Sequence, residues 1–176
     1  MNAVSTTTMV SPEIGEPSRG AIAQTITSVR NPKVKYIRLL RLRKYRLREG
    51  RFLVEGIRVV EEALSCEAPL ETLVYAPELL TSDRVSALLK KVSPDRHLLL
   101  SGDAFRTLSS RDKPQGIAAV IRIEDHPLSA IAPSDNLMAI VAYQLQDPGN
   151  LGAIIRTADA AAASGVIVVE PAVDVY

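Results

Sequence analysis

A glycine-containing segment near the end of the chain holds the residues whose types and spacing could do chemistry. Within Gln146–Gly165, Gly149 and Gly152 would let the backbone approach a ligand closely. The helix expected to start there offers unpaired N–H groups and the positive end of its dipole. Arg156 follows four residues after Gly152, where the helix dipole disfavours a cation. A bound anion, or an oxyanion formed during a reaction, would account for that arginine.

Two features of this segment stay open from the residues alone. Arg156 could instead form a surface pair with Asp159 at i, i+3, worth a few tenths of a kcal/mol. Asp147-Pro148 and Asn150 are rival candidates for the helix cap. The glycine spacing matches neither the dinucleotide-binding fingerprint nor the Walker pattern.

The positive charge of the protein is concentrated in the segment Arg30–Arg51. The protein has a net charge of +1, yet this segment carries ten cations and one acid, Glu49. The cations are Arg30, Lys33, Lys35, Arg38, Arg41, Arg43, Lys44, Arg46, Arg48 and Arg51. All other residues together carry eleven bases and nineteen acids. This uneven distribution of charge favours a polyanion as the binding partner. The alternative is a helix face that is solvated and binds no partner.

A helix is expected to begin at Asn31-Pro32, with asparagine as N-cap and proline in the first helical position. Tyr36, Ile37 and Leu40 would fall on one side of it and form a core stripe. The cations Lys35, Arg38 and Arg41 would face solvent on the other side. Within the basic segment we predict contacts to a nucleic acid for Arg30, Lys33, Lys35, Arg38, Arg41 and Arg46.

Short strands alternate with helices in the rest of the first part, which predicts an α/β layer architecture. The pattern predicts strands at Phe52–Val54, Leu70–Tyr75, His97–Leu100 and Gly116–Ile123, and helices at Ile57–Leu64, Val85–Val92 and Asp103–Leu108. Residues 1–24 are expected to be a flexible tail, 25–123 a first domain, and 124–136 a linker between domains.

The second part, residues 137–176, is predicted to form one βαβ unit. Strands at Leu137–Ala142 and Val166–Val169 would flank a helix at Leu151–Ala163, with the two strands parallel. The helix residues expected to pack on the sheet are Leu151, Ile154, Ile155, Ala158 and Ala162. One such unit cannot close a domain, so its outer faces are expected to stay uncovered.

Composition excludes several classes of protein. The 176 residues, 47% of them hydrophobic, contain no apolar run near the roughly 20 residues that span a bilayer. No secretory signal pattern is present, so the expected location is cytoplasmic. One cysteine, Cys66, with His97 and His126 cannot build a zinc site of the Cys/His type, and we treat all three as structural. No metal site is predicted.

The sequence DPGNLGAIIRTADAAAASG closely resembles the first signature motif of the SpoU/TrmH branch of the SPOUT methyltransferases. Upstream, SVRNPKVKYIRLLRLRKYRLREGRFLVEG is similar to the start of that family's RNA-binding substrate domain, and KPQGIAAV to its closing strand. The resemblance covers roughly residues 26–170 and implies a ribosomal-protein-like α/β domain followed by part of a trefoil-knotted SPOUT domain. Glu55-Gly56 also recurs in the family motif, and we interpret it as a tight turn from strand to helix.

The resemblance implies 2′-O-ribose methylation of RNA, ribosomal RNA first, with S-adenosylmethionine as methyl donor and a homodimer as the usual assembly. Arg156 would contact the target ribose-phosphate, and Asn150 would help to shape the site. The family's two later motifs, which supply most of the cofactor pocket, are missing, so the chain is expected to be a fragment, inactive alone. A non-catalytic RNA-binding module is the alternative function, and a nucleotide-binding enzyme a weaker one.

Overall fold

The computed structural model describes residues 24–124, 126–131 and 137–176. The tail expected at 1–24 therefore lies outside the described residues, except for Gln24. Of the linker expected at 124–136, residues 125 and 132–136 are likewise outside them, and Leu128–Ala130 forms a turn of 3₁₀ helix, η3. Two further turns of this kind are η1, Pro77–Leu79, and η2, Pro94–Arg96.

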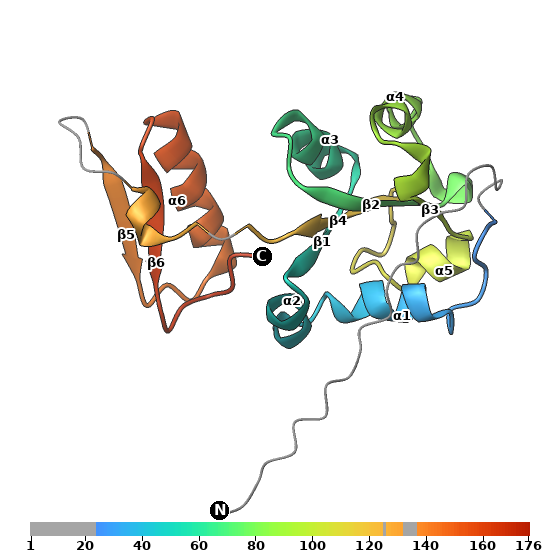
Figure 1. The fold of residues 1–176 in the computed structure, drawn as a ribbon, viewed down its shortest axis with the longest axis horizontal. Helices are drawn as coiled ribbons and strands as arrows, with labels where there is room; N and C mark the ends of the chain where they lie inside the picture. Colours follow the sequence, from blue (N-terminus) through green and yellow to red (C-terminus); the bar gives the residue numbers. More distant parts are fainter. Residues whose placement is uncertain (1–23, 125, 132–136) are drawn as a thin grey trace, which may run out of the picture.

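The first part of the chain is a four-stranded sheet with helices on both faces (Figure 1). The strand order is β1 (Arg51–Glu55), β4 (Ile117–Arg122), β2 (Leu70–Tyr75) and β3 (His97–Leu99). Only β2 and β3 are parallel to each other. Helices α1 (Pro32–Leu39) and α5 (Gly102–Arg106) cover one face, and α3 (Ile57–Ser65) and α4 (Arg84–Lys91) cover the other. The predicted α/β architecture is confirmed.

The core lies in two layers because strand side chains alternate between the faces of the sheet. In β4, Ala118 and Val120 join the cluster under α1 and α5, whereas Ile117 joins the cluster under α3 and α4. Strand β2 breaks this alternation, since Leu70 and Leu73 both face α3 and α4. A register shift between Leu70 and Thr72 explains it, because a bulge adds one residue and reverses the side on which the following residues point.

The segment before Gly50 forms two helices rather than one. Asn31 caps α1 as expected, its side chain accepting a hydrogen bond from the Lys33 N–H at 2.9 Å. The helix ends after Leu39, and α2 runs over Arg43–Glu49 until Gly50 terminates it with φ 61°. The expected core residues Ile37 and Leu40 are buried and Tyr36 partly so. Strand β1 is half-buried along its length, not buried as its apolar residues suggested.

The second part of the chain forms the predicted βαβ unit. Strands β5 (Ala139–Tyr143) and β6 (Gly165–Val169) are parallel, and α6 (Pro148–Ala160) connects them. Leu151 and Ala158 are buried against the sheet. The expectation for Ile155 and Ala162 was wrong: Ile155 is 44% exposed, and Ala162 is exposed beyond the end of α6. Two strands about 5 Å apart are too narrow to cover the whole apolar stripe of a helix about 10 Å wide.

The outer face of this unit is apolar and open in the described residues. Val141 is 61% exposed and Tyr143 66%. Uncovered strand side chains of this kind agree with the expectation that one βαβ unit cannot close a domain. Within the parts of the chain that the structure describes, no helix has the length and apolar character needed to cross a membrane.

Candidate active site and RNA-binding surface

The loops that follow β5 and β6 lie together at the carboxyl ends of these parallel strands. The Val173 N–H donates to the Leu145 carbonyl at 2.7 Å, and Gln146 Nε2 donates to the Pro171 carbonyl at 3.2 Å. The carboxyl edge of a parallel sheet is where α/β folds bind ligands, since loops from neighbouring strands meet there. The glycine-containing segment found in the sequence therefore begins at the edge where a site is expected.

Asp147 caps α6, which resolves the choice that the sequence left open. Its Oδ1 accepts a hydrogen bond from the Asn150 N–H at 2.7 Å, and Pro148 takes the first helical position. Asn150 consequently lies in the first turn of the helix, with its side chain exposed. The helix begins three residues earlier than predicted, because the aspartate supplies the cap and proline is pre-shaped for the first turn.

Arg156 lies exposed on α6 and extends back toward the start of the helix. A Cβ atom built on Gly152 would be 3.3 Å from Arg156 Nη1, closer than ordinary contact. This approach follows from helix geometry, since side chains point toward the N-terminus and residues i and i+4 are neighbours. The absence of a side chain at Gly152 leaves the space that the guanidinium uses.

The described residues contain no ion pair between Arg156 and Asp159. No hydrogen bond joins Arg156 to Asn150 within that same part of the chain, and the two residues are about 9 Å apart along the helix axis. A phosphate or ribose could therefore reach both only by lying along the exposed side of α6. The arrangement offers a cation, an amide and a helix N-terminus to such a group.

Five of the six cations predicted to contact RNA are exposed on or beside α1. Arg30 and Lys33 lie at its start, Lys35 and Arg38 lie along it, and Arg41 follows its last turn. The core contacts of this segment are made by the buried Val34, Ile37 and Leu40, so the exposed cations can bind a ligand without disturbing the core.

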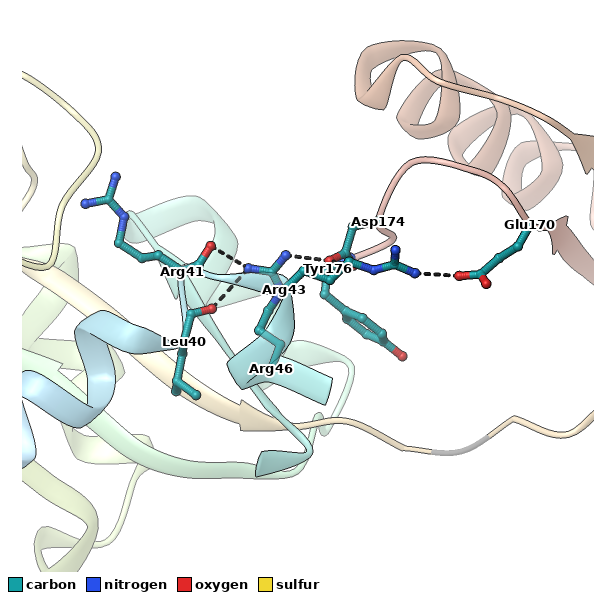
Figure 2. A network of polar contacts seen from close by, with 7 residues as sticks. All are labelled: Leu40, Arg41, Arg43, Arg46, Glu170, Asp174 and Tyr176. Atoms are coloured by element: carbon teal, nitrogen blue, oxygen red, sulfur yellow. Dashed lines mark hydrogen bonds and ion pairs between the residues drawn. The ribbon is translucent and has the colours of Figure 1, made fainter. Parts of the chain in front are cut away.

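Arg46 differs from the other five, because its guanidinium is largely buried and binds three groups of the protein (Figure 2). Its Nη1 donates to the carbonyls of Leu40 at 3.1 Å and Arg41 at 2.7 Å, where α1 ends. Its Nη2 donates to Asp174 Oδ2 at 2.5 Å, and only 12% of the side chain is exposed. The geometry places Arg46 as a connector between α1, α2 and the segment after β6 rather than as a free phosphate ligand.

The acidic residues that pair with Arg43 and Arg46 are Glu170 and Asp174. The sequence alone singled out neither of them. Arg43 forms an ion pair with Glu170 and lies 3.7 Å from Asp174 (Figure 2). Burial opposes the charge on Asp174, but hydrogen bonds from the Tyr176 N–H and from Arg46 outweigh it and hold the pKa of this carboxyl below its ordinary value. The surplus of acids outside the basic segment was the available signal for such a contact.

The residues of α6 line neither of two shallow hollows found on the surface. One, of about 190 Å³, is lined by residues of α2 and of the segment after β6, among them Arg43 and Tyr176. The other, of about 270 Å³, lies at the start of β2 and the end of β4, beside Arg96 and Arg122. Neither of these two hollows therefore lies next to Arg156. The described residues also contain no cluster of three or more His, Cys, Asp or Glu that could hold a metal ion.

Comparison with known proteins identifies both parts of the chain. Residues 31–119 match the MRM3-like substrate binding domain, and residues 137–176 match the SpoU rRNA Methylase family. These are the parts that carry the exposed cations of α1 and the exposed Arg156 of α6. The chain belongs to the SpoU/TrmH family of RNA methyltransferases, as the resemblance implied.

Curated relatives agree with this assignment. The chain is 34% identical to 23S rRNA (guanosine(2553)-2′-O)-methyltransferase RlmP of Bacillus subtilis, over 86% of this chain and 56% of that protein. It is 31% identical to 23S rRNA (uridine(2479)-2′-O)-methyltransferase of Streptomyces viridochromogenes, over 90% of this chain and 55% of that protein. The chain thus spans about half the length of the curated relatives it matches.

Solved structures show the same architecture. The AdoMet-bound rRNA methyltransferase from Sinorhizobium meliloti superposes with a TM-score of 0.72 at 35% identity, over 86% of this chain and 56% of that one. The SpoU methyltransferase AviRb from Streptomyces viridochromogenes, in complex with AdoMet, gives 0.74 at 31% identity, over 84% and 56%. The expected order, an N-terminal α/β domain followed by part of a SPOUT domain, is confirmed.

Proposed function

We propose that the protein transfers a methyl group from S-adenosylmethionine to the 2′-hydroxyl of a ribose in ribosomal RNA. The observation that carries the proposal is the pairing, in one chain, of a cationic helix on an MRM3-like substrate domain with an exposed arginine in a SpoU motif. Relatives named for 23S rRNA 2′-O-methylation support the substrate class. They act on a guanosine and a uridine, so the base that this protein would modify is left unassigned.

Arg156 would hold the target phosphate and the charge that develops on the ribose oxygen. A guanidinium donates hydrogen bonds and accepts none, so it acts as an electrostatic organiser rather than as a proton acceptor. Asn150 would orient the ribose from the first turn of α6. S-adenosylmethionine would supply an electrophilic methyl group.

Arg30, Lys33, Lys35, Arg38 and Arg41 would bind the RNA backbone. These cations are exposed on a helix whose other side is buried, so they form a surface of fixed shape. Contacts to phosphates supply affinity and orientation without reading sequence. The homodimer that the family resemblance implies is part of the proposal, and light scattering on the complete protein tests it.

The experiment replaces Lys35, Arg38 and Arg41 by alanine and measures binding to labelled 23S rRNA fragments. We expect affinity to fall and to depend less on salt, because fewer counterions are released from the RNA. In the complete protein, methyl incorporation at limiting RNA should fall in parallel.

A matched control removes three exposed cations from the opposite face of the sheet, with Arg58→Ala, Lys90→Ala and Lys91→Ala. The control should retain the affinity of the unchanged protein, while both triple variants keep its melting temperature. Equal loss in the two variants would show that only total charge matters, and unchanged affinity in both would refute RNA binding by α1.

A further inference from the structure

The loop between α5 and β4, residues 109–115, lies against three elements that are distant from it in sequence. We call it the 109–115 loop; it contains Ser109, Arg111, Asp112, Lys113 and Gln115 among others. It contacts the end of α1, the end of β1 and the start of α3. Its position is therefore fixed by side-chain contacts although it has no regular structure of its own.

The first contact joins the loop to the cationic surface of α1. Arg41 Nη1 donates to the Ser109 carbonyl at 3.2 Å. Arg41 is one of the cations assigned to RNA binding above, so the loop begins directly beside that surface. A ligand that lies along α1 and passes Arg41 meets the loop next.

The second contact explains one half of the Glu55-Gly56 pair. Glu55 Oε1 accepts a hydrogen bond from Ser109 Oγ at 2.7 Å, and Ser109 Oγ in turn accepts one from the Arg111 N–H at 2.9 Å. The Glu55 carboxylate thus fixes the backbone at Arg111 through a hydroxyl. Glu55 is a positioning residue in this arrangement, and its charge faces the loop.

The third contact explains the other half of the pair. Gly56 has φ 110°, and a Cβ atom there would be 3.1 Å from Gln115 Oε1 and 3.6 Å from Arg111 Nη2. Gln115 Oε1 accepts from the Ile57 N–H at 2.9 Å, and so provides the cap that a glycine cannot give to α3. Glycine is required here both by its backbone angle and by the close approach of the loop.

We propose that the 109–115 loop is a second part of the RNA interface, in which Arg111 and Lys113 contact phosphates and Glu55 holds the loop in place. Both cations are exposed, and neither forms an ion pair with the residues that the structure describes. They outnumber the loop's one acid, Asp112, and they extend the positive surface beyond Arg41. The proposal rests on the RNA-binding function proposed above and adds a separate contact to it.

A phosphate backbone fits this surface better than stacked bases do. The loop contains no aromatic residue, so it lacks the stacking platforms of single-strand readers. Its two cations add to the positive charge beside Arg41, which suits a ligand with several negative charges.

The test compares Arg111→Ala/Lys113→Ala with Lys90→Ala/Lys91→Ala in the 176-residue chain, using labelled 23S rRNA fragments at several salt concentrations. We expect the loop variant to bind more weakly, with a log–log salt slope lower by about 1.4–1.8, from 0.7–0.9 per lost phosphate contact. The control variant removes the same charge from α4 and should keep both affinity and slope. If the alanine variant has a lower melting temperature than the unchanged chain, the same salt titration is made with Arg111→Gln/Lys113→Gln, and that result decides.

Glu55 is tested by two substitutions, of which only one keeps a side-chain oxygen. Glu55→Gln keeps an oxygen that accepts from Ser109 and should retain affinity, whereas Glu55→Ala should weaken it. An unchanged slope in the loop variant, with weaker binding by the α1 triple variant, would overturn this inference and leave the proposed function intact. Unchanged binding in both would overturn the two together.

Discussion

Arg46 Nη2 donates to Asp174 Oδ2 at 2.5 Å, across 128 positions of the chain. The same guanidinium binds two carbonyls at the end of α1, so a single side chain joins the basic segment to the residues that follow β6 (Figure 2). Both side chains are mostly buried, with 12% and 20% exposed. Part of the positive charge that the sequence concentrates near α1 is therefore used inside the protein.

The contact predicts a pH dependence of stability. The pKa of Asp174 is lower in the folded chain than in the unfolded one, so its contribution is complete above the unfolded value of about 3.9 and is lost as pH falls through the folded value. We expect Asp174→Asn to lose about 1 kcal/mol at pH 7, and less below pH 4. Thermal unfolding between pH 7 and 2.5 measures it. Asp103→Asn, in an exposed pair with Arg106, should show neither effect.

Replacing Arg156 by alanine should remove catalysis without unfolding the protein. We expect methyl incorporation by the complete protein to fall by about 10²–10³-fold, comparable to the loss of an oxyanion donor. The melting temperature should stay unchanged because the side chain is exposed. Asp159→Ala on the same helix is the control and should methylate normally. Normal methylation by the Arg156 variant would instead show that this arginine has no catalytic role.

Gly152→Ala should change stability and activity in opposite directions. Alanine in place of glycine within a helix gains about 0.5–1 kcal/mol. The added methyl group would lie 3.3 Å from Arg156 Nη1 and would displace the guanidinium. Melting temperature should therefore rise while methyl incorporation falls. Ala153→Gly, one residue further along α6, should lower the melting temperature and leave methyl incorporation unchanged. A Gly152 variant with full activity would contradict the role given to this space.

Two glycines with positive φ should respond differently to substitution. Gly56 has φ 110°, where side chains are rarely tolerated, and it is closed in by Gln115. We expect Gly56→Ala to lose about 1–3 kcal/mol in a urea titration. Gly50 has φ 61° with nothing within 4 Å of an added Cβ atom, and asparagine tolerates this region. Gly50→Asn should lower the free energy of unfolding by less than about 1 kcal/mol. Equal losses in the two variants would show that the contacts around Gly56 do not restrict a side chain there.

Much of the fold could be predicted because its elements are short and clearly bounded. Pro69 and Pro77 bound Leu70–Tyr75, which is a strand over the residues predicted. Asn31-Pro32 identified the start of α1 for the same reason. The break between α1 and α2 was missed, since neither glycine nor proline marks it and the carbonyls freed there are satisfied by a side chain from α2.

The candidate site was harder to predict wherever long-range contacts decide it. Sequence spacing singled out Arg156 and grouped Arg46 with the other cations of the basic segment. Only the folded chain brings Asp174 to Arg46, and only there does Ser109 meet Glu55. Glu55-Gly56 was correctly interpreted as a strand-to-helix turn, but the cap on that helix comes from Gln115, 58 positions away.

The position of β4 has a consequence for the order of folding. It is the last strand of the first sheet in sequence, yet it lies between β1 and β2, and Arg51 is paired with Arg122. During synthesis the chain cannot complete this sheet until Arg122 has left the ribosome. The reason is that β1 and β2 both form their hydrogen bonds with β4, which is made last. Ribosome-bound chains that stop before Ile117 would keep α1 and its apolar side without a complete sheet to cover it.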